Sequence, residues 1–350
     1  MSKKNKIIVI IVSYNGKEYW PELLPTLLEE KYQDIDVEVL VVDNNSSDGS
    51  ADYLARNYPM IKIIRSISNL GFVGANNLGY QYAKDNKADY IYLLNQDTVV
   101  TTGFLRPLYD FAKANKFGSL QSKLRLWPAK EKINTIGNAI HFLGFGYSIG
   151  LDSVDKNNQE IKKINYASGA GVFLSMEALA AKGGLFDETM FMYLEDLDLG
   201  WQLSLLAWDN YLIPGSIVYH KYEFNRGTKQ YYWFERNRLW VMLKNYKIKT
   251  MIVIFPAWLV MEVAQVFYAL INRRLKDKIR AYSFLFSKKQ RQLLFSQRHS
   301  IQSKRQRNDK QVIGNFVARI LFQPLNSPAL KIANIIFFIY WRVVKLFIFW

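Results

Sequence analysis

Three acidic residues, Glu195, Asp196 and Asp198, lie within four positions in the stretch MYLEDLDLGWQ. They directly follow an apolar run, residues 191–194. Burial beside such a run raises the pKa of a carboxyl group and makes it usable as a general base near neutral pH. The same pattern is typical of a solvated helix start, since acids interact favourably with a helix N-terminus. The residues alone leave both interpretations open.

A second polar group interrupts the apolar stretch YLLNQDTVV at Asn95, Gln96 and Asp97. Carboxylate oxygens are the ligands that hard divalent cations prefer, so Asp97 could hold a cation. It could equally cap the segment that follows. His220, one of three histidines, follows the strand-like run 215–219. A lone histidine in such a place is commonly structural, but it can also be a metal ligand.

Hydrophobic periodicity predicts the elements that position these side chains. Continuous apolar runs predict buried strands at 7–13, 37–43, 61–65 and 90–95, and helical spacing predicts helices over 18–30, 50–57 and 75–84. This alternation predicts an α/β protein with a doubly wound, mostly parallel sheet. The first apolar run is short and lacks a small-residue cleavage site, so a buried strand fits it better than a signal peptide.

Polar residues follow all four predicted strands, at 13–15, 43–49, 68–77 and 95–97. In sheets of this kind, ligands bind at the carboxyl ends of the strands. Turn chemistry alone explains any single loop of this composition. Four such loops at one edge favour a ligand site. There is no GxGxxG or Walker pattern, which disfavours an ordinary dinucleotide-binding or P-loop protein.

Five segments carry a family resemblance: VVDNNSSDGS, NLGFVGANNLGY, LLNQDTVV, SGAGVFLSMEAL and GLFDETMFMYLEDLDLGW. In this order they resemble the inverting glycosyltransferase family 2, with the GT-A fold, over about residues 6–245. The bacterial rhamnosyltransferase-like branch is the most similar. The resemblance implies a nucleotide-sugar donor with a diphosphate leaving group, whose charge a divalent cation must neutralise.

The resemblance also implies roles for individual residues. Asp196 would be the base that takes the proton of the acceptor hydroxyl in a single displacement, with Glu195 supporting it or binding the acceptor. Asp97, together with His220, would hold Mg²⁺ or Mn²⁺. The expected donor-binding residues are Ser13, Asn15, Asp43, Asn69, Gly74, Asn76, Asn77, Asn95, Gln96 and Arg236.

Three positions depart from the family pattern. Asn95 stands where the first Asp of an Asp-X-Asp motif is usual, so metal binding would rest mostly on Asp97. Asn76 and Gln202 stand where arginine is common. Arg236 lies among aromatic residues and could instead belong to an amphipathic helix. The departures at Asn95 and Gln202 leave a second hypothesis open, a non-catalytic nucleotide-sugar-binding or scaffold protein of a glycan-assembly complex.

The charge is unevenly distributed along the 350 residues. Residues 1–230 hold 24 Lys/Arg and 26 Asp/Glu, whereas residues 231–350 hold 22 Lys/Arg and 4 Asp/Glu. This asymmetry predicts a catalytic domain over 1–230 and an amphipathic helical region over 231–350. Cysteine is absent. Its absence excludes a disulfide scaffold and thiolate chemistry, and it suits a reducing compartment.

Two segments of the basic region are long and apolar, 251–271 and 333–350. If both spanned a membrane, the segment 272–332, with 15 Lys/Arg, would be exported against the positive-inside tendency. We therefore expect helices lying in the interface at the cytoplasmic face of an anionic membrane, peripheral or monotopic, although a single span by 251–271 stays open. Runs such as IIFFIYW disfavour a nucleic-acid-binding arm.

Taken together, these expectations describe a membrane-associated transferase of cell-surface polysaccharide assembly. Its donor would be a dTDP- or UDP-sugar, first of all dTDP-rhamnose, and its acceptor a lipid-linked saccharide.

Overall fold

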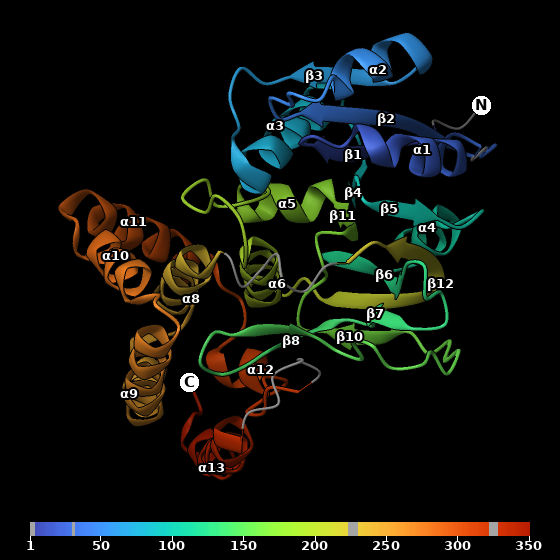
Figure 1. Cartoon of the computed structure of the whole chain (residues 1–350). Coiled ribbons are helices and arrows are strands. Elements are labelled where there is room, and N and C mark those ends of the chain that lie inside the picture. The colour runs from blue at the N-terminus through green and yellow to red at the C-terminus, as the bar shows by residue number, and fades with distance from the viewer. Residues whose placement is uncertain (1–3, 30–31, 223–229, 322–327) are drawn as a thin grey trace. The chain divides into compact units, whose positions relative to one another are not determined.

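The computed structural model describes residues 4–29, 32–222, 230–321 and 328–350 (Figure 1). The chain divides into two compact units. The first comprises residues 1–138, 148–203 and 208–222, and the second comprises 139–147, 204–207 and 223–350. The predicted boundary at 230 lies next to residues 223–229, which are outside the described part. The sequence did not predict that residues 139–147 belong with the C-terminal helices.

The strands are β1 (Asn5–Ser13), β2 (Ile35–Asp43), β3 (Lys62–Arg65), β4 (Tyr90–Asn95), β5 (Thr98–Val100), β6 (Ser119–Leu126), β7 (Ile133–Thr135), β8 (Asn138–Ile140), β9 (Gly146–Ser148), β10 (Lys162–Ile164), β11 (Gly171–Ser175) and β12 (Asn210–His220). The helices of the first unit are η1 (Lys17–Tyr19), α1 (Trp20–Leu28), α2 (Ser50–Asn57), α3 (Gly71–Asp85), α4 (Leu105–Ala114), α5 (Met176–Lys182) and α6 (Glu195–Leu205), whose last residues belong to the second unit. Those of the second unit are α8 (Tyr231–Asn245), α9 (Ile248–Ile271), α10 (Leu275–Phe286), α11 (Lys288–Lys304), α12 (Asp309–Ile313), α13 (Pro328–Val344) and η2 (Lys345–Phe347).

The first unit is built on a mixed sheet with the order β10-β12-β6-β11-β4-β1-β2-β3. Strands β4, β1, β2 and β3 are parallel, and they are the four strands that the apolar runs predict. Residues 7–11 of β1 are fully buried, as expected for a strand covered on both faces. The predicted α/β class is confirmed, with antiparallel strands added on one side.

Register places the carboxyl ends of the parallel strands together. Ser13 pairs with Asp43, and Val12 pairs with Asn95. The antiparallel strand β11 continues the sheet beyond β4, with Gly171 opposite Leu94. The short strand β5 pairs with the end of β12, so that Thr98 lies opposite His220. The sheet therefore gathers residues that are far apart in the sequence at one edge.

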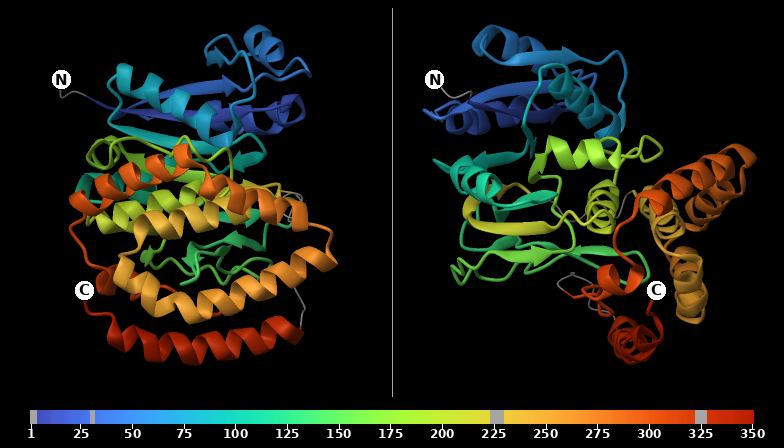
Figure 2. Two further views of the ribbon diagram at one scale, coloured as in Figure 1. Left: turned by 90° about the vertical axis from the view of Figure 1, so that its left-hand side faces the viewer. Right: turned by 180° about the vertical axis from the view of Figure 1, so that it is seen from behind.

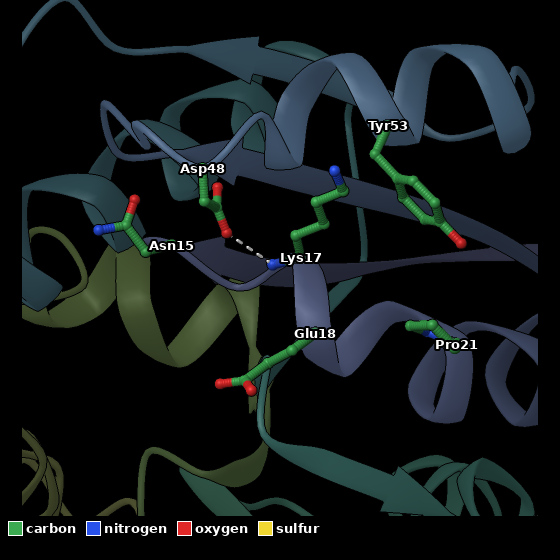
Figure 3. Close-up of a pocket in the computed structure, with 6 residues that line it drawn as sticks. All are labelled: Asn15, Lys17, Glu18, Pro21, Asp48 and Tyr53. Atoms are coloured by element: carbon green, nitrogen blue, oxygen red, sulfur yellow. Dashed lines mark hydrogen bonds between the residues drawn. The ribbon is translucent and has the colours of Figure 1, made fainter.

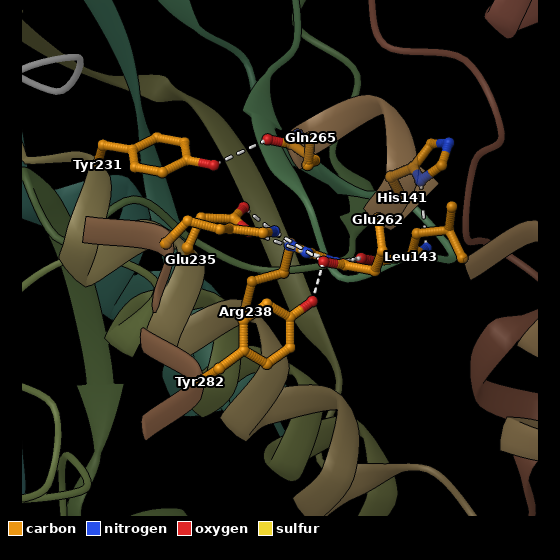
Figure 4. A network of polar contacts seen from close by, with 9 residues as sticks. His141, Leu143, Tyr231, Glu235, Arg238, Glu262, Gln265 and Tyr282 are labelled. Atoms are coloured by element: carbon orange, nitrogen blue, oxygen red, sulfur yellow. Dashed lines mark hydrogen bonds and ion pairs between the residues drawn. The ribbon is translucent and has the colours of Figure 1, made fainter. Parts of the chain in front are cut away.

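Helices α8, α9 and α10 of the second unit are joined by a buried network of charges (Figure 4). Arg238 pairs with Glu235 at 3.1 Å and also with Glu262, and Lys278 pairs with Glu262 at 2.7 Å and also with Glu235. Two acids and two bases thus neutralise one another. Burial by itself would raise the pKa of Glu262, but the charges of Arg238 and Lys278 outweigh it and lower this pKa to about 2.

Removal of one member of this network should destabilise the second unit strongly. Glu262→Ala would leave two buried cations facing the single carboxylate of Glu235, a loss of about 3–5 kcal/mol for a broken buried ion pair. Gln265→Ala is the matched control on the same helix, because Gln265 is uncharged and the hydrogen bond that it accepts from the Tyr231 hydroxyl is long, at 3.3 Å. Thermal unfolding followed by circular dichroism compares them. Equal melting temperatures for the two variants would show that the network is energetically unimportant.

Candidate active site

Asp97 and His220 form a buried pair at the edge of the sheet. Their Oδ1 and Nε2 atoms lie 3.3 Å apart, and each side chain is about nine-tenths buried. The pairing of β5 with β12 holds the two residues together, and the Lys221 N–H donates to the Asp97 carbonyl at 2.9 Å. On the far side of the ring, His220 Nδ1 lies 3.0 Å from Asn134 Oδ1.

The hydrogen bond with Asn134 defines what the pair can bind. With Asn134 Oδ1 as acceptor, Nδ1 carries the ring proton, so a neutral ring turns an acceptor nitrogen toward the Asp97 carboxylate. Two acceptors at this distance repel each other unless a proton or a cation lies between them. The pair can therefore hold either a shared proton or a divalent cation, and the bond between Asn134 and His220 is of the kind that orients metal ligands.

Among the described residues, no third acidic, histidine or cysteine side chain joins this pair to make a metal site. A cation held here would take its remaining ligands from phosphate oxygens and water. Such a site is usual for Mg²⁺ and Mn²⁺ that bind together with a phosphorylated substrate.

Ser13 and Asp43 lie at the paired ends of β1 and β2. Ser13 Oγ and Asp43 Oδ1 are buried and have no hydrogen-bond partner in the described part of the chain. Buried polar atoms without a partner are costly, so this edge has unused hydrogen-bonding capacity. Asn15 adopts a left-handed backbone conformation, φ 49°, and its Oδ1 accepts the Ser47 N–H at 2.8 Å.

A pocket of about 460 Å³ opens beside these strand ends (Figure 3). Its lining residues are Asn15, Lys17, Glu18, Pro21, Asp48 and Tyr53. Of the predicted donor-binding residues it includes Asn15, but neither Asp97 nor Asp196 lines it. The pocket therefore lies beside the predicted reacting residues and does not contain them.

Several predicted donor-binding side chains bond the backbone of neighbouring segments. Gln96 Oε1 and Nε2 bond the Tyr14 N–H and carbonyl at 3.0 and 3.1 Å. Asn69 Oδ1 accepts the Gly71 N–H at 2.8 Å, and Asn76 Nδ2 donates to the Phe72 carbonyl at 2.8 Å. These side chains organise the loops at the edge. Their roles toward a donor remain predictions.

Asn77 joins helix α3 to the segment that precedes the acidic cluster. Its Nδ2 donates to the Phe186 carbonyl at 3.1 Å, and its Oδ1 accepts the Phe186 N–H at 3.0 Å. The Val73 N–H donates to the Phe191 carbonyl at 3.2 Å.

The same segment approaches the first turn of α3 closely. A Cβ on Gly71, where φ is +71°, would lie 2.3 Å from the Phe191 oxygen. Glycine is therefore required at this position. At Gly74, a predicted donor-binding residue, an added Cβ would lie 2.8 Å from the Cβ of Leu70, the residue that directly precedes α3.

The residues just before the acidic cluster have a strained backbone conformation. Tyr193 and Leu194 both have positive φ, 68° and 64°, immediately before Glu195 opens α6. Non-glycine residues rarely adopt this conformation, and it costs free energy. Here the contacts with α3 maintain it, which fixes where α6 begins and where its first carboxylates lie.

Asp196 is linked to the edge of the sheet through the two residues that precede β11. The Asn95 N–H donates to the Ala170 carbonyl at 3.2 Å, and the N–H of the preceding residue, Gly169, lies 3.4 Å from Asp196 Oδ2. Burial raises the pKa of Asp196 to about 6, despite the N–H groups of Leu197 and Gly169 that favour its charged form. Burial, and then the charge of Asp196, raise the pKa of Glu195 well above its usual value. The pKa of Asp196 is thus in the range that suits a general base, and its role in catalysis stays a prediction.

Gln202 and Arg236 both contact neighbouring protein side chains. Gln202 Nε2 donates to Asp198 Oδ2 at 2.7 Å, so Asp198 keeps a partner although the arginine of the family pattern is absent. Arg236 belongs to the second unit, where its guanidinium lies 4.4 Å from the centre of the Trp233 ring and hydrogen-bonds Asn237. Its role toward a donor remains a prediction.

Sequence reasoning missed Asn134, Asn44 and the importance of Asn77 as a tether. Asn44 is buried, accepts the Leu70 N–H at 2.8 Å and donates to Asn69 at 3.0 Å, so it holds two edge loops together. A strand-end position was the only signal for Asn44. Asn134 lies in a stretch that has no periodic pattern and gave no signal at all.

Comparison with known proteins identifies a matching family. Residues 8–179 match the family model described as glycosyl transferase family 2. The N-acetylglucosaminyl-diphospho-decaprenol L-rhamnosyltransferase of Mycobacterium tuberculosis is 26% identical over 204 residues, which are 53% of this chain and 66% of that protein. A low-salt glycan biosynthesis hexosyltransferase of Haloferax volcanii is 24% identical, over 54% of this chain and 59% of the relative. These matches thus span less than two thirds of each relative.

Solved structures support the fold. GalNAc-T7 with UDP, GalNAc and Mn²⁺ superposes with a TM-score of 0.59 at 14% identity, over 73% of this chain and 51% of that one. S. aureus TarS 1-349 in complex with UDP-GlcNAc superposes with a TM-score of 0.51 at 15% identity, over 97% of this chain and 90% of that one. At these identities the likeness establishes the fold alone, and that fold is GT-A.

Gly71→Ala should disturb the acidic segment. Both this variant and the control Gly103→Ala place a side chain at a left-handed position, a cost of about 1–2 kcal/mol. Only Gly71 has a backbone oxygen in the way, because nothing lies within 4 Å of the Cβ at Gly103. We expect Gly71→Ala to lower the stability to denaturant by about 1–3 kcal/mol more than the control does. Equal losses would show that the contact with Phe191 is dispensable.

The raised pKa of Asp196 predicts how stability depends on pH. The folded chain binds this proton more tightly than the unfolded chain, so the ionised carboxylate destabilises the fold once the pH rises through about 6. Asp196→Asn should therefore melt at a higher temperature than the wild type near pH 8. The difference should shrink as the pH falls toward the usual value of 3.8. The exposed Asp85→Asn should show no such trend, and a pH-independent difference for Asp196→Asn would contradict the assignment.

Proposed function

Residues 8–179 belong to glycosyl transferase family 2, and from this premise we propose that the protein is an inverting, metal-dependent glycosyltransferase. It would transfer a sugar from a nucleotide diphosphate to a lipid-linked glycan during cell-surface polysaccharide assembly. One observation carries the proposal: Asp196, a carboxylate with a pKa of about 6, is joined through the residues just before β11 to Asn95, which ends β4 two positions before the Asp97 of the Asp97–His220 pair.

The chemistry assigned to Asp196 is a single displacement. Its carboxylate accepts the proton of an acceptor hydroxyl while that oxygen bonds to the anomeric carbon of the donor sugar. The bond from this carbon to the diphosphate oxygen breaks, and the electron pair leaves with the nucleotide. The anomeric configuration inverts, and the proton remains on Asp196. Glu195, which retains its proton to a higher pH than an ordinary glutamate, would donate a hydrogen bond to the acceptor.

Asp97 Oδ1 and His220 Nε2 would hold Mg²⁺ or Mn²⁺ against the diphosphate, and Asn134 keeps the imidazole oriented. A bound divalent cation neutralises the charge that develops on the leaving group. Asn95 carries no charge, so Asp97 is the principal anionic ligand at this strand end. Asp43 Oδ1 would accept the ring N–H of a pyrimidine, with Ser13 Oγ beside it.

We assign the donor as a dTDP- or UDP-sugar, with dTDP-rhamnose first. The named activity of the mycobacterial relative supports rhamnose and a lipid-linked acceptor. Two solved structures that superpose on the chain, GalNAc-T7 with UDP and S. aureus TarS 1-349 with UDP-GlcNAc, support a pyrimidine nucleotide. The protein would act at the cytoplasmic face of the membrane, where α9 is the one described helix long and apolar enough to cross a bilayer.

The hypothesis of a non-catalytic scaffold rested on Asn95 and Gln202. The hydrogen bond from Gln202 to Asp198 removes half of that argument, because it shows how a neutral side chain can replace the usual arginine. The buried pair of Asp97 and His220 weakens the other half, since a cation can be held without a second aspartate.

Donor turnover tests the catalytic proposal. Purified protein with Mn²⁺ or Mg²⁺ should release nucleotide from one of a panel of nucleotide sugars, and more of it when membrane lipid extract supplies the acceptor. Asp196→Asn should lower the rate by about 10²–10⁴-fold, the usual contribution of a general base. Asp85→Asn, which removes an exposed carboxylate on α3, should not change it. If the wild type and Asp196→Asn are equally inactive with every sugar, the enzyme proposal fails.

Asp97→Ala tests the assignment of the metal. This variant should lose the divalent-cation-dependent part of donor binding, measured by titration calorimetry with and without a chelator, and keep its association with membranes. A variant that retains full cation-dependent binding would rule out Asp97 as a ligand.

A further inference from the structure

Helix α9 presents apolar side chains to solvent along its whole length. Ile248, Ile252, Phe255, Leu259, Val263 and Phe267 are all exposed, at spacings of three or four residues that place them on one side. Soluble proteins rarely leave a continuous apolar stripe of this size uncovered. The stripe runs from Ile248, in the first turn of the helix, to Phe267 near its end, a distance of about 29 Å.

The side of α9 that faces α8 and α10 is buried and carries an acidic residue. Glu262 is 5% exposed and bonds Arg238 of α8 and Lys278 of α10. Helices α8 and α10 have 15 and 12 residues, fewer than the roughly 20 that cross a bilayer. If α9 stood across a membrane, these charged neighbours would be drawn into hydrocarbon with it, which is costly.

Helix α13 adds a second apolar stripe beside the first. Ile332, Ile335, Ile339 and Val343 are exposed, whereas Phe337 and Trp341 on the opposite side are buried. The Tyr340 hydroxyl donates to the Val253 carbonyl at 2.7 Å and so ties α13 to α9. Both helices appear nearly end-on in Figure 1 and lengthwise in the left view of Figure 2, so their axes run roughly parallel.

Basic residues flank both stripes at both ends. Lys249 lies in the first turn of α9 and Arg273 just after its end, and both are exposed. Lys331 and Arg342 lie near the two ends of α13 and are also exposed. If α9 crossed a bilayer, Lys249 and Arg273 would lie at opposite surfaces. If it lies flat, all four cations reach the headgroups of one leaflet.

We propose that α9 and α13 lie side by side in the plane of an anionic phospholipid leaflet, with their apolar stripes in the acyl region and the flanking cations at the phosphates. The inference deepens the membrane location included in the proposed function, on which it rests, and excludes a transmembrane α9. The buried network around Glu262 keeps the polar side of α9 turned toward protein.

Depth-dependent fluorescence tests the orientation, and the natural absence of cysteine makes single labelling sites simple to introduce. Ile252→Cys, Leu259→Cys and Phe267→Cys would each carry an environment-sensitive dye. Vesicles of phosphatidylglycerol and phosphatidylcholine would contain quenchers at known depths. A flat α9 predicts the same shallow depth for all three dyes. A transmembrane α9 predicts a deep dye at 259 and shallow dyes at 252 and 267 in opposite leaflets, which would overturn the proposal.

A second set of variants measures the contribution of the stripes. Leu259→Glu combined with Ile339→Glu should lower partition into these vesicles at least ~10-fold. Ile67→Glu is the matched control, since Ile67 is an isolated side chain in the first unit that is 97% exposed. Circular dichroism verifies that each variant is folded. Equal partition of the double variant and the wild type would also overturn the proposal.

Two further outcomes count against the lipid assignment. Complete release of the wild type from vesicles by high salt would indicate electrostatic adsorption alone. A shift of the dye spectra without vesicles, growing with protein concentration, would indicate a second copy of the chain on the stripes. None of these measurements depends on turnover. Loss of the enzymatic proposal would therefore leave the orientation result standing, and the converse also holds.

Discussion

The parallel register of β4, β1 and β2 is the constraint on which the rest of the first unit depends. It places Ser13 beside Asp43 and Val12 beside Asn95, so that loops distant in sequence open at one edge. Antiparallel strands then extend this edge. The segment before β11 brings the N–H of Gly169 to Asp196, and the pairing of β5 with β12 brings His220 to Asp97. A shift of one residue in any of these ladders would turn the side chains to the other face of the sheet and separate the groups.

Helix α3 connects the nucleotide side of this edge with the acids. Its first turn approaches Phe191 so closely that only glycine fits at position 71, and Asn77 bonds both backbone groups of Phe186. These contacts stabilise the positive φ of Tyr193 and Leu194, which would be unfavourable in an unsupported loop. The free energy of packing α3 thus compensates for strain next to Asp196. This explains how a surface segment can hold a partly buried carboxylate in one place.

The sequence predicted local features well and long-range pairings poorly. Continuous apolar runs identified β1, β2, β3 and β4, and the family resemblance is confirmed by the match over residues 8–179. Strand β5 has only three residues, too few to show a period, so its pairing with His220, 123 positions away from Asp97, had no local signal. Asn77 matched a family position that contacts donor, yet its amide is engaged with backbone, because side-chain contacts depend on which loop packs against α3. Asn134 was missed for the same reason.

Glu262 has opposite implications for membrane contact when it is seen in the sequence and when it is seen in the structure. In the sequence it interrupts an apolar segment and counts against burial in lipid. In the structure it faces Arg238, Lys278 and Tyr282, so the charge is neutralised inside the second unit and the exposed stripe of α9 is left without an acidic residue. An average hydropathy cannot distinguish these cases, since it does not record on which side of a helix a residue lies. Because the network fixes the rotation of α9 about its own axis, it also determines that the stripe faces away from α8 and α10. The polar residues of α9 are therefore what make its apolar side available.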